Sequence, residues 1–281
     1  MCFDSTCTAD DPDRREFLTG AGAALAVLAV SGSETSAQNK TPPTRVLDDP
    51  AVSHGKVMFK HNGKETFGGY LARPKADGTY PGVLVIAGNK ITEEYIPNTC
   101  AALALAGFVG LAPDVMHPIP DAARTNEEYA KYAGEHTELD RLDDVQVGAS
   151  YLRAQPFVSR GGLAVVGFCR GGRDALLFGA RSREVDAVVA FHPAPMRPKE
   201  LDRLTIPVQV HHGTGDRAVA HTHTQDLERM LRERKRPVEV FLYEKLDHGF
   251  LAYTRPFYDP DAAQLAWKRT VEFLNTHLKK E

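Results

Sequence analysis

Short apolar runs alternate with helical stretches along most of this 281-residue chain, and no other feature constrains its fold more. The runs, such as residues 83–87 and 187–191, are almost continuously apolar. Strands of that composition are buried on both faces, as in parallel sheets covered by helices. The sequence therefore predicts an α/β fold with a single domain, in which helices lie on both faces of a mostly parallel, twisted sheet.

The predicted strands and helices follow one another with short connections. Strands are expected at residues 57–61, 69–73, 83–87, 109–112, 163–167, 187–191, 208–212 and 238–243. Helices are expected at 96–106, 139–153, 172–180, 222–234 and 261–278. The turn dipeptide Asn62-Gly63 joins the first two strands into an antiparallel hairpin. The polar segment 117–138 is predicted to be a loop with a short helix over the carboxyl ends of the strands.

The N-terminal region, residues 1–40, has the pattern of a targeting segment. Arg14-Arg15 is followed by an uncharged run from Gly20 to Val30 and then by small and polar residues. That run is too short to span a bilayer. A buried helix is the alternative, but the arginine pair directly before the run favours a twin-arginine signal peptide with a disordered continuation. The predicted export machinery is the twin-arginine system, the predicted location is periplasmic or secreted without a stable membrane anchor, and residues 41–281 form the folded domain.

Net charge gives no reason to expect a polyanionic partner. The chain carries a formal charge of −3, whereas nucleic-acid and anionic membrane surfaces select basic proteins. A small molecule is the expected partner, and a monomer is the expected state. The histidine-rich stretch of His211, His212, His221 and His223 could suggest a metal, but neighbours on a strand face opposite ways. We therefore interpret these histidines as structural or surface residues.

The strongest chemical signal is a cysteine at the end of a predicted strand. Residues 167–171 read Gly-Phe-Cys-Arg-Gly, which is the nucleophile elbow G-x-S-x-G with Cys169 in the serine position. A Cβ at Gly167 or Gly171 would collide with neighbouring backbone in so tight a turn. The alternative is a buried structural cysteine in a glycine turn. Cys100, in an alanine-rich helical run, is expected to be a core residue, although a disulfide between the two cysteines remains an alternative.

Two further residues follow in the order that this kind of elbow requires. Asp216 comes after the strand 208–212, and His248 after the strand 238–243. Alone, each could be a turn or core residue; together with Cys169 they predict a catalytic triad. His248 would act as general base, Asp216 would orient it, and Cys169 would form a thioester. Backbone N–H groups of Arg170 and of Gly88 or Asn89 are the predicted oxyanion hole.

These motifs resemble the dienelactone hydrolase family over residues 57–278. The shared features are residues 167–172, residues 107–114 and residues 248–250 followed by Trp267. The resemblance implies the α/β-hydrolase fold, opening of an enol-lactone of the carboxymethylenebutenolidase type, and no metal or organic cofactor. It also implies arginines that hold a substrate carboxylate. The candidates are Arg124, Arg170, Arg255 and the cation Lys90, and the alternative for each is a solvated surface charge.

The chain departs from the family at one position. Members usually carry His-Glu after the strand that here precedes Ala87-Gly88, and that glutamate is thought to help generate the thiolate. Activation of Cys169 must then rely on His248 and the helix terminus, or the substrate must differ. A general carboxylesterase or thioesterase on the same scaffold is therefore the first alternative, and a catalytically silent binding protein is the second.

Overall fold

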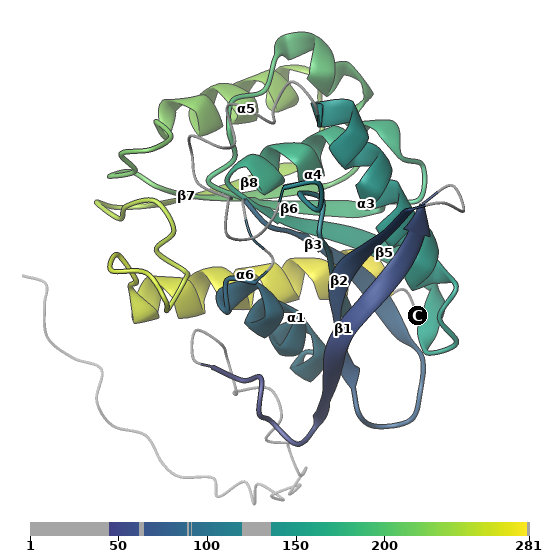
Figure 1. The fold of residues 1–281 in the computed structure, drawn as a ribbon. Helices are drawn as coiled ribbons and strands as arrows, with labels where there is room; N and C mark the ends of the chain where they lie inside the picture. Colours follow the sequence, from purple (N-terminus) through teal and green to yellow (C-terminus); the bar gives the residue numbers. More distant parts are fainter. Residues whose placement is uncertain (1–44, 62–64, 89, 91, 120–135, 280–281) are drawn as a thin grey trace, which may run out of the picture. The chain divides into compact units, whose positions relative to one another are not determined.

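The computed structural model describes residues 45–61, 65–88, 90, 92–119 and 136–279, all within one compact unit (Figure 1). The strands are β1 (Val52–His61), β2 (Glu65–Pro74), β3 (Tyr80–Ile86), β4 (Val109–Pro113), β5 (Val158–Phe168), β6 (Ala187–Phe191), β7 (Val208–Gly213) and β8 (Val238–Tyr243). The helices are α1 (Tyr95–Leu105), α3 (Glu138–Arg153), α4 (Arg170–Arg181), α5 (Thr222–Glu233), α6 (Pro260–Leu278) and the 3₁₀ helix η3 (Pro198–Arg203).

All eight strands form one sheet in the order β1-β2-β4-β3-β5-β6-β7-β8. β1 pairs antiparallel with β2, and β2 antiparallel with β4. Every other neighbouring pair is parallel. The predicted mostly parallel sheet and its opening hairpin are thereby confirmed; the turn residues of the hairpin lie outside the described residues.

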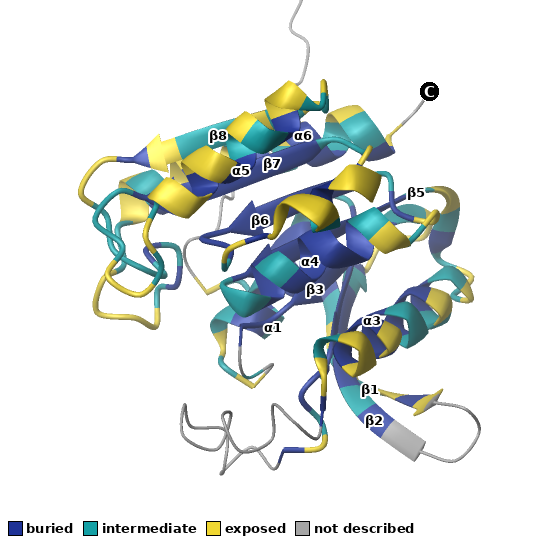
Figure 2. Cartoon of the chain, turned by 90° about the horizontal axis from the view of Figure 1, so that it is seen from above, coloured by how far each residue is buried: buried dark blue, intermediate teal, exposed yellow. Residues whose placement is uncertain are grey.

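Side chains of the central strands point alternately into two apolar layers. In β3, Leu84 and Ile86 face one layer, whereas Val83 and Val85 face the other. Helices α3, α4 and α5 cover the first face, and α1 and α6 cover the second (Figures 1 and 2). Because both faces are covered, β3 and β6 are buried almost throughout, which explains their continuous apolar runs.

Local polar contacts fix where two of the helices begin. At α3, the Thr137 hydroxyl accepts the Asp140 N–H, and the Asp140 carboxylate accepts the Thr137 N–H in return. At α6, the Asp259 carboxylate accepts the Ala262 N–H at 2.9 Å, and Pro260 follows at the first helical position. Among the described helices, none has the length and apolar character needed to cross a bilayer.

The chain reverses its order of strands at β3, which lies between β4 and β5. After β3 it passes to β4 on one side, and after β4 it passes to β5 on the other. Crevices that bind ligands form at the carboxyl ends of strands beside such a reversal. The fold therefore places a site at the end of β5, where Cys169 lies.

Candidate functional site

Cys169 occupies the sharp turn between β5 and α4. Its backbone angles are φ 56° and ψ −119°, a strained conformation for a residue with a side chain. The flanking glycines make the turn possible: a Cβ on Gly167 would overlap the backbone of Gly171, and a Cβ on Gly171 would overlap the backbone of Ile86. The thiol is thereby held at the N-terminus of α4, whose partial positive charge favours a thiolate.

His248 joins Cys169 to Asp216. The Nδ1 of His248 lies 2.8 Å from the Oδ2 of Asp216, and the Cys169 sulfur is close enough to the ring to help raise the pKa of His248. Asp216 follows β7 and His248 follows β8, so three separate strand ends contribute to one cluster. The structure therefore brings together the three residues that the sequence analysis singled out.

The ring of His248 favours its protonated form. Burial lowers the pKa of His248, but hydrogen bonds to Asp216 and Cys169, together with the charges of those groups, outweigh that effect and raise it to about 9. At neutral pH the ring is consequently an imidazolium. A cation beside the sulfur stabilises a thiolate, without the glutamate that Gly88 replaces.

The side chain of Asp216 is fully buried and receives four hydrogen bonds. Oδ1 accepts the N–H groups of Ala218 and Val219, both at 2.8 Å. Oδ2 accepts from the Nδ1 of His248 at 2.8 Å and from the Nε2 of His212 at 3.1 Å. Burial alone would raise the pKa of Asp216, but these donors hold it far below its usual range. The carboxylate therefore stays ionised.

His212 contacts Asp216 on the side away from Cys169, and the sequence analysis missed this. Its Nε2 faces two acceptors, Asp216 Oδ2 and the carbonyl of Val219 at 3.0 Å, so Nε2 carries the proton. Its Nδ1 consequently accepts the hydroxyl of Thr224 at 2.6 Å. His211 instead bonds Tyr243 and Gln209 and is structural, as predicted. In the sequence, only the spacing of four residues between His212 and Asp216 could have indicated this contact.

His192 is a second histidine beside the cluster of Cys169, His248 and Asp216 that sequence reasoning missed. It follows β6, has φ 38° and is only 5% exposed. Its ring centroid lies 4.1 Å from that of His248, and its buried Nδ1 has no hydrogen-bond partner among the described residues. Burial and the charge of His248 lower the pKa of His192 well below the ordinary histidine value. A neutral ring thus packs against the imidazolium.

The loop after β3 lies against Cys169. A Cβ on Gly88 would come within 3.2 Å of the Cβ of Cys169, and the guanidinium of Arg170 donates to the Gly88 carbonyl. Arg170 is also the first residue of α4. Two of the predicted oxyanion-hole residues therefore flank Cys169, whereas Asn89 lies outside the described residues.

A pocket of about 590 Å³ opens over Cys169 and His248. Of the predicted substrate-binding residues, Arg255 lines it and is paired with Glu93 at 2.6 Å. Lys90 is half-buried and is not among the lining residues. Arg124 lies outside the described residues. The pocket also contains Arg217, which the sequence analysis did not single out.

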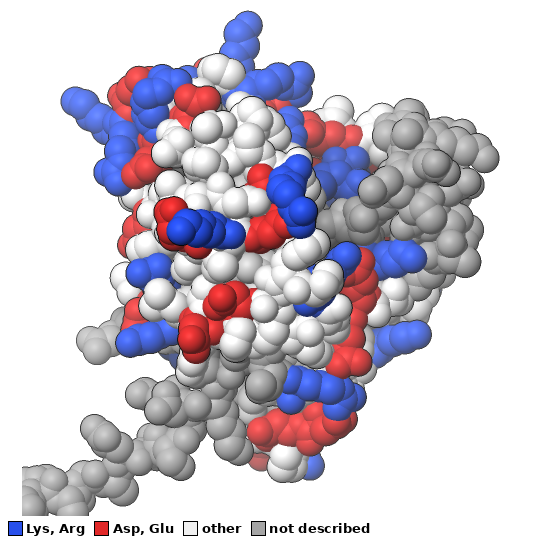
Figure 3. Space-filling model, turned by 90° about the vertical axis from the view of Figure 1, so that its left-hand side faces the viewer, with Lys and Arg blue, Asp and Glu red and all other residues white. Residues whose placement is uncertain are grey.

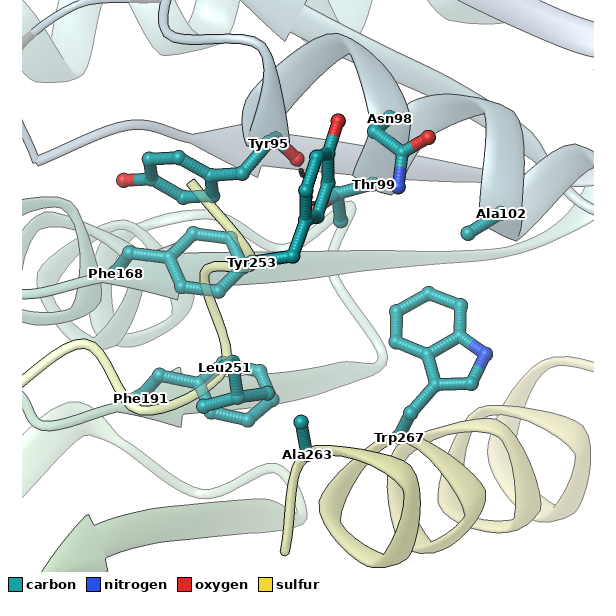
Figure 4. Close-up of a pocket in the computed structure, with 10 residues that line it drawn as sticks. All are labelled: Tyr95, Asn98, Thr99, Ala102, Phe168, Phe191, Leu251, Tyr253, Ala263 and Trp267. Atoms are coloured by element: carbon teal, nitrogen blue, oxygen red, sulfur yellow. Dashed lines mark hydrogen bonds between the residues drawn. The ribbon is translucent and has the colours of Figure 1, made fainter. Parts of the chain in front are cut away.

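A smaller apolar cavity of about 40 Å³ adjoins this pocket (Figure 4). The two share the side chains of Tyr95, Phe168 and Leu251. Figure 4 shows the cavity enclosed between α1 and α6, with Trp267 reaching in from α6. Because most of its lining side chains are apolar, this cavity suits a small apolar substituent.

Both described cysteines are free thiols, which removes the disulfide alternative. Cys100 is a fully buried core residue, as predicted, and burial raises the pKa of its thiol. One described cluster, formed by His117, His136 and Asp144, has the spacing of metal ligands. However, the Nε2 of His136 lies 2.9 Å from the Val115 carbonyl oxygen and must carry a proton there. In this arrangement that nitrogen is a hydrogen-bond donor and not a metal ligand.

Two predicted segments fall wholly or mostly outside the described residues. They are the N-terminal region 1–40 and most of the segment 117–138, of which 120–135 are not described. The targeting function of the first and the loop structure of the second stay predictions.

Comparison with known proteins matches residues 67–278 to the dienelactone hydrolase family. A Bradyrhizobium protein named "Probable 2-oxo-3-(5-oxofuran-2-ylidene)propanoate lactonase" is 31% identical over 74% of this chain and 89% of its own length. A Yersinia pestis "Putative carboxymethylenebutenolidase" is 28% identical over 82% of this chain and 91% of its own. A Klebsiella pneumoniae structure described as "Putative Dienelactone Hydrolase" superposes with a TM-score of 0.75 at 24% identity, covering 81% of this chain and all of that one. The chain belongs to the dienelactone hydrolase family and is a carboxylic ester hydrolase with the α/β-hydrolase fold.

Proposed function

We propose that the protein opens an ester or lactone of a small molecule through a thioester on Cys169, as in carboxymethylenebutenolidase-type enzymes. The observation that carries this proposal is that Cys169 and His248 line one pocket of about 590 Å³ and that His248 is hydrogen-bonded to Asp216 behind it. A nucleophile, a base and an orienting carboxylate in that order are the components of covalent acyl transfer.

The reaction proceeds in two acyl transfers. The Cys169 thiolate attacks the acyl carbon, the C–O bond of the ester breaks, and His248 gives its proton to the departing alkoxide. Water then attacks the thioester while His248 takes a proton from it, and the thiolate leaves. Each step passes through a tetrahedral oxyanion, which the backbone N–H of Arg170 and donors of the loop at Gly88 and Asn89 would stabilise.

Two alternatives are distinguishable from this reaction. A general carboxylesterase or thioesterase would use the same residues on acyclic substrates, and a panel of p-nitrophenyl esters, acyl thioesters and enol-lactones separates the two. A catalytically silent binding protein would leave Cys169 unreactive. The raised pKa of His248 favours an enzyme, because a binding protein has no use for a charged ring beside a thiol.

Alkylation of Cys169 tests whether its sulfur is activated. Because His248 keeps its proton up to pH about 9, we expect iodoacetamide to label Cys169 at neutral pH much faster than it labels free cysteine, whose pKa is about 8.5. The His248→Ala variant should lose this advantage. Equal and slow labelling in both proteins would favour the silent protein. Labelling of the Cys169 peptide is followed by mass spectrometry.

The pH profile of kcat/KM should have an alkaline limb near pH 9. His248 must be protonated to release the alkoxide, and its raised pKa places the loss of that proton at about 9. Because folding raises the pKa of His248, protonation of this ring contributes to the free energy of unfolding. The contribution is fully present below pH 6.5, the ordinary pKa of histidine, and is lost as the pH rises through about 9. Melting temperatures measured from pH 6 to 10 and initial rates should therefore decline over about the same interval.

His212 should act as a positioning residue for Asp216. His212→Leu removes the Nε2 donor from Asp216 Oδ2, and we expect kcat to fall by about tenfold to a hundredfold. His212→Gln retains a donor and an acceptor on one side chain and should recover most of this loss. The matched control is His211→Leu, which removes another buried ring without touching Asp216. Equal losses of kcat in the two leucine variants would indicate a general packing effect.

We also propose that the chain is exported by the twin-arginine system to the periplasm or beyond and acts there as a monomer. The observation behind this is the pair Arg14-Arg15 before the apolar run 20–30. Replacing both arginines by lysine should retain the protein in the cytoplasm, which cell fractionation would detect. Gel filtration of the mature chain tests the oligomeric state.

A further inference from the structure

The described acidic and basic residues that line the pocket over Cys169 pair with one another in two ion pairs. Among the described lining residues, the side chains that carry a charge outside the catalytic line are Glu93, Asp247, Arg217 and Arg255. Arg255 lies 2.6 Å from Glu93. Arg217 lies against Asp247, with its Nε 2.6 Å from Oδ2 and its backbone N–H 3.0 Å from Oδ1. Each arginine therefore already has a carboxylate partner in the free enzyme.

The pair of Arg217 and Asp247 is held by more than its two charges. The guanidinium also lies 5.1 Å from the centre of the Phe257 ring. Burial raises the pKa of Asp247, but hydrogen bonds from the Arg217 and His248 backbones and from the Arg217 side chain outweigh this and lower it. Asp247 thus stays ionised and keeps Arg217 in place.

The catalytic residues add no uncompensated positive charge. The imidazolium of His248 lies between Asp216 and the Cys169 sulfur, and the neighbouring ring of His192 is neutral. A substrate carboxylate would meet Glu93 beside Arg255 and Asp247 beside Arg217, so attraction to each guanidinium would be offset by repulsion from its partner. On the face drawn in Figure 3, positive and negative side chains are likewise interspersed, with no continuous patch of one sign.

The remaining walls are apolar and suit an uncharged group. Tyr95, Phe168, Leu251 and Phe257 line the pocket, and the first three continue into the cavity between α1 and α6 (Figure 4). Apolar side chains around a few placed polar groups are typical of sites for neutral small molecules.

We infer that this enzyme acts on neutral esters or lactones and discriminates against substrates that carry a carboxylate, because Glu93 and Asp247 neutralise Arg255 and Arg217, the arginines among the described residues that line its pocket. This inference rests on the proposed function. It assigns Glu93 and Asp247 as specificity-determining residues. Arg255 then serves as the partner of Glu93 and not as the anchor for a substrate anion.

A pair of chromogenic esters that differ only in charge tests the inference. Mono-p-nitrophenyl succinate carries a free carboxylate, and its methyl ester is neutral and of similar shape. We expect the wild type to hydrolyse the neutral compound with a kcat/KM at least about tenfold higher, because a substrate carboxylate would lose hydration in the pocket without gaining a net attraction from the paired arginines. A wild type that prefers the carboxylate compound would overturn the inference while leaving the proposed function intact.

The Glu93→Gln variant should change the preference of the enzyme between the two esters. The substitution removes one negative charge and leaves Arg255 available, so the ratio of kcat/KM for the carboxylate compound to kcat/KM for the neutral compound should rise by about tenfold. The matched control is Glu94→Gln, because Glu94 pairs with Arg45 and Tyr253 and does not line the catalytic pocket. An equal response in both variants, or none in Glu93→Gln, would contradict the role of Glu93.

The same assays separate this inference from the proposed function. If neither compound is hydrolysed and neither acylates Cys169, as judged by mass spectrometry of the quenched protein, the proposed function fails and the inference fails with it. If both compounds acylate Cys169 at equal rates, only the inference on charge fails.

Discussion

Cys169→Ala should abolish turnover, with kcat falling by at least about 10⁴-fold. In the proposed mechanism the sulfur forms the bond to the acyl group, and the structure offers no other nucleophile at the turn between β5 and α4 among the described residues. The methyl group of alanine still fits the position where the Cβ of Cys169 approaches Gly88. We therefore expect the free energy of unfolding to change by no more than about 1 kcal/mol.

Cys100→Ala is the matched control for this variant. Cys100 is also a free cysteine, but it is fully buried in α1, where its loss affects packing and not chemistry. It should keep full activity below its melting temperature. Rapid quenching of the wild type with a p-nitrophenyl ester should add the acyl mass to the peptide that contains Cys169. Full activity in Cys169→Ala, or an acyl group on another peptide, would exclude the thioester mechanism.

The buried strands could be predicted from sequence because burial on both faces leaves a local pattern. β6 and β8 have the predicted bounds, at Ala187–Phe191 and Val238–Tyr243. The opening hairpin was predicted too short, since β1 begins at Val52 and β2 begins at Glu65. In β1, at the edge of the sheet, exposed residues such as His54 and Lys56 alternate with half-buried ones such as Gly55 and Val57, so no continuous apolar run marks its extent.

The 3₁₀ helix η3 was not predicted at all. Its six residues, Pro198–Arg203, are mostly polar and too few for a helical period to be visible. It begins at a proline, and Glu200 accepts the Arg197 N–H at 2.6 Å. Such short elements depend on particular contacts, here that of Glu200 with Arg173 of α4, which a single sequence does not reveal.

The residues of the site likewise divide into those with a local sequence pattern and those that depend on contacts between distant parts of the chain. Cys169, Asp216 and His248 could be singled out because each follows a recognisable strand and because the elbow has a glycine signature. Neither the packing of His192 on His248 nor the pairing of Arg255 with Glu93, 162 residues away, leaves any local pattern. The specificity that we infer depends on this second group. This specificity could therefore be inferred from the structure and not from the sequence alone.

Asp216→Asn should lower kcat by about 10⁴-fold, because it forces His248 into the wrong tautomer. The Oδ1 position must remain an acceptor, since the N–H groups of Ala218 and Val219 both point at it from 2.8 Å. The new amide NH₂ would then occupy the Oδ2 position and face His248 Nδ1 and His212 Nε2. His248 could satisfy it only by accepting at Nδ1, which places its proton on Nε2.

A ring protonated at Nε2 cannot take a proton from the Cys169 thiol, so both the thiolate and the imidazolium are lost. The activity that remains should therefore lack the alkaline limb near pH 9, which distinguishes this mechanism from a simple loss of stability. Asp247→Asn is the control, because Asp247 bonds the His248 backbone and not its ring. With the neutral ester, it should stay within about tenfold of the wild type. If Asp216→Asn had the smaller effect of the two, Asp247 and not Asp216 would be the carboxylate on which catalysis depends.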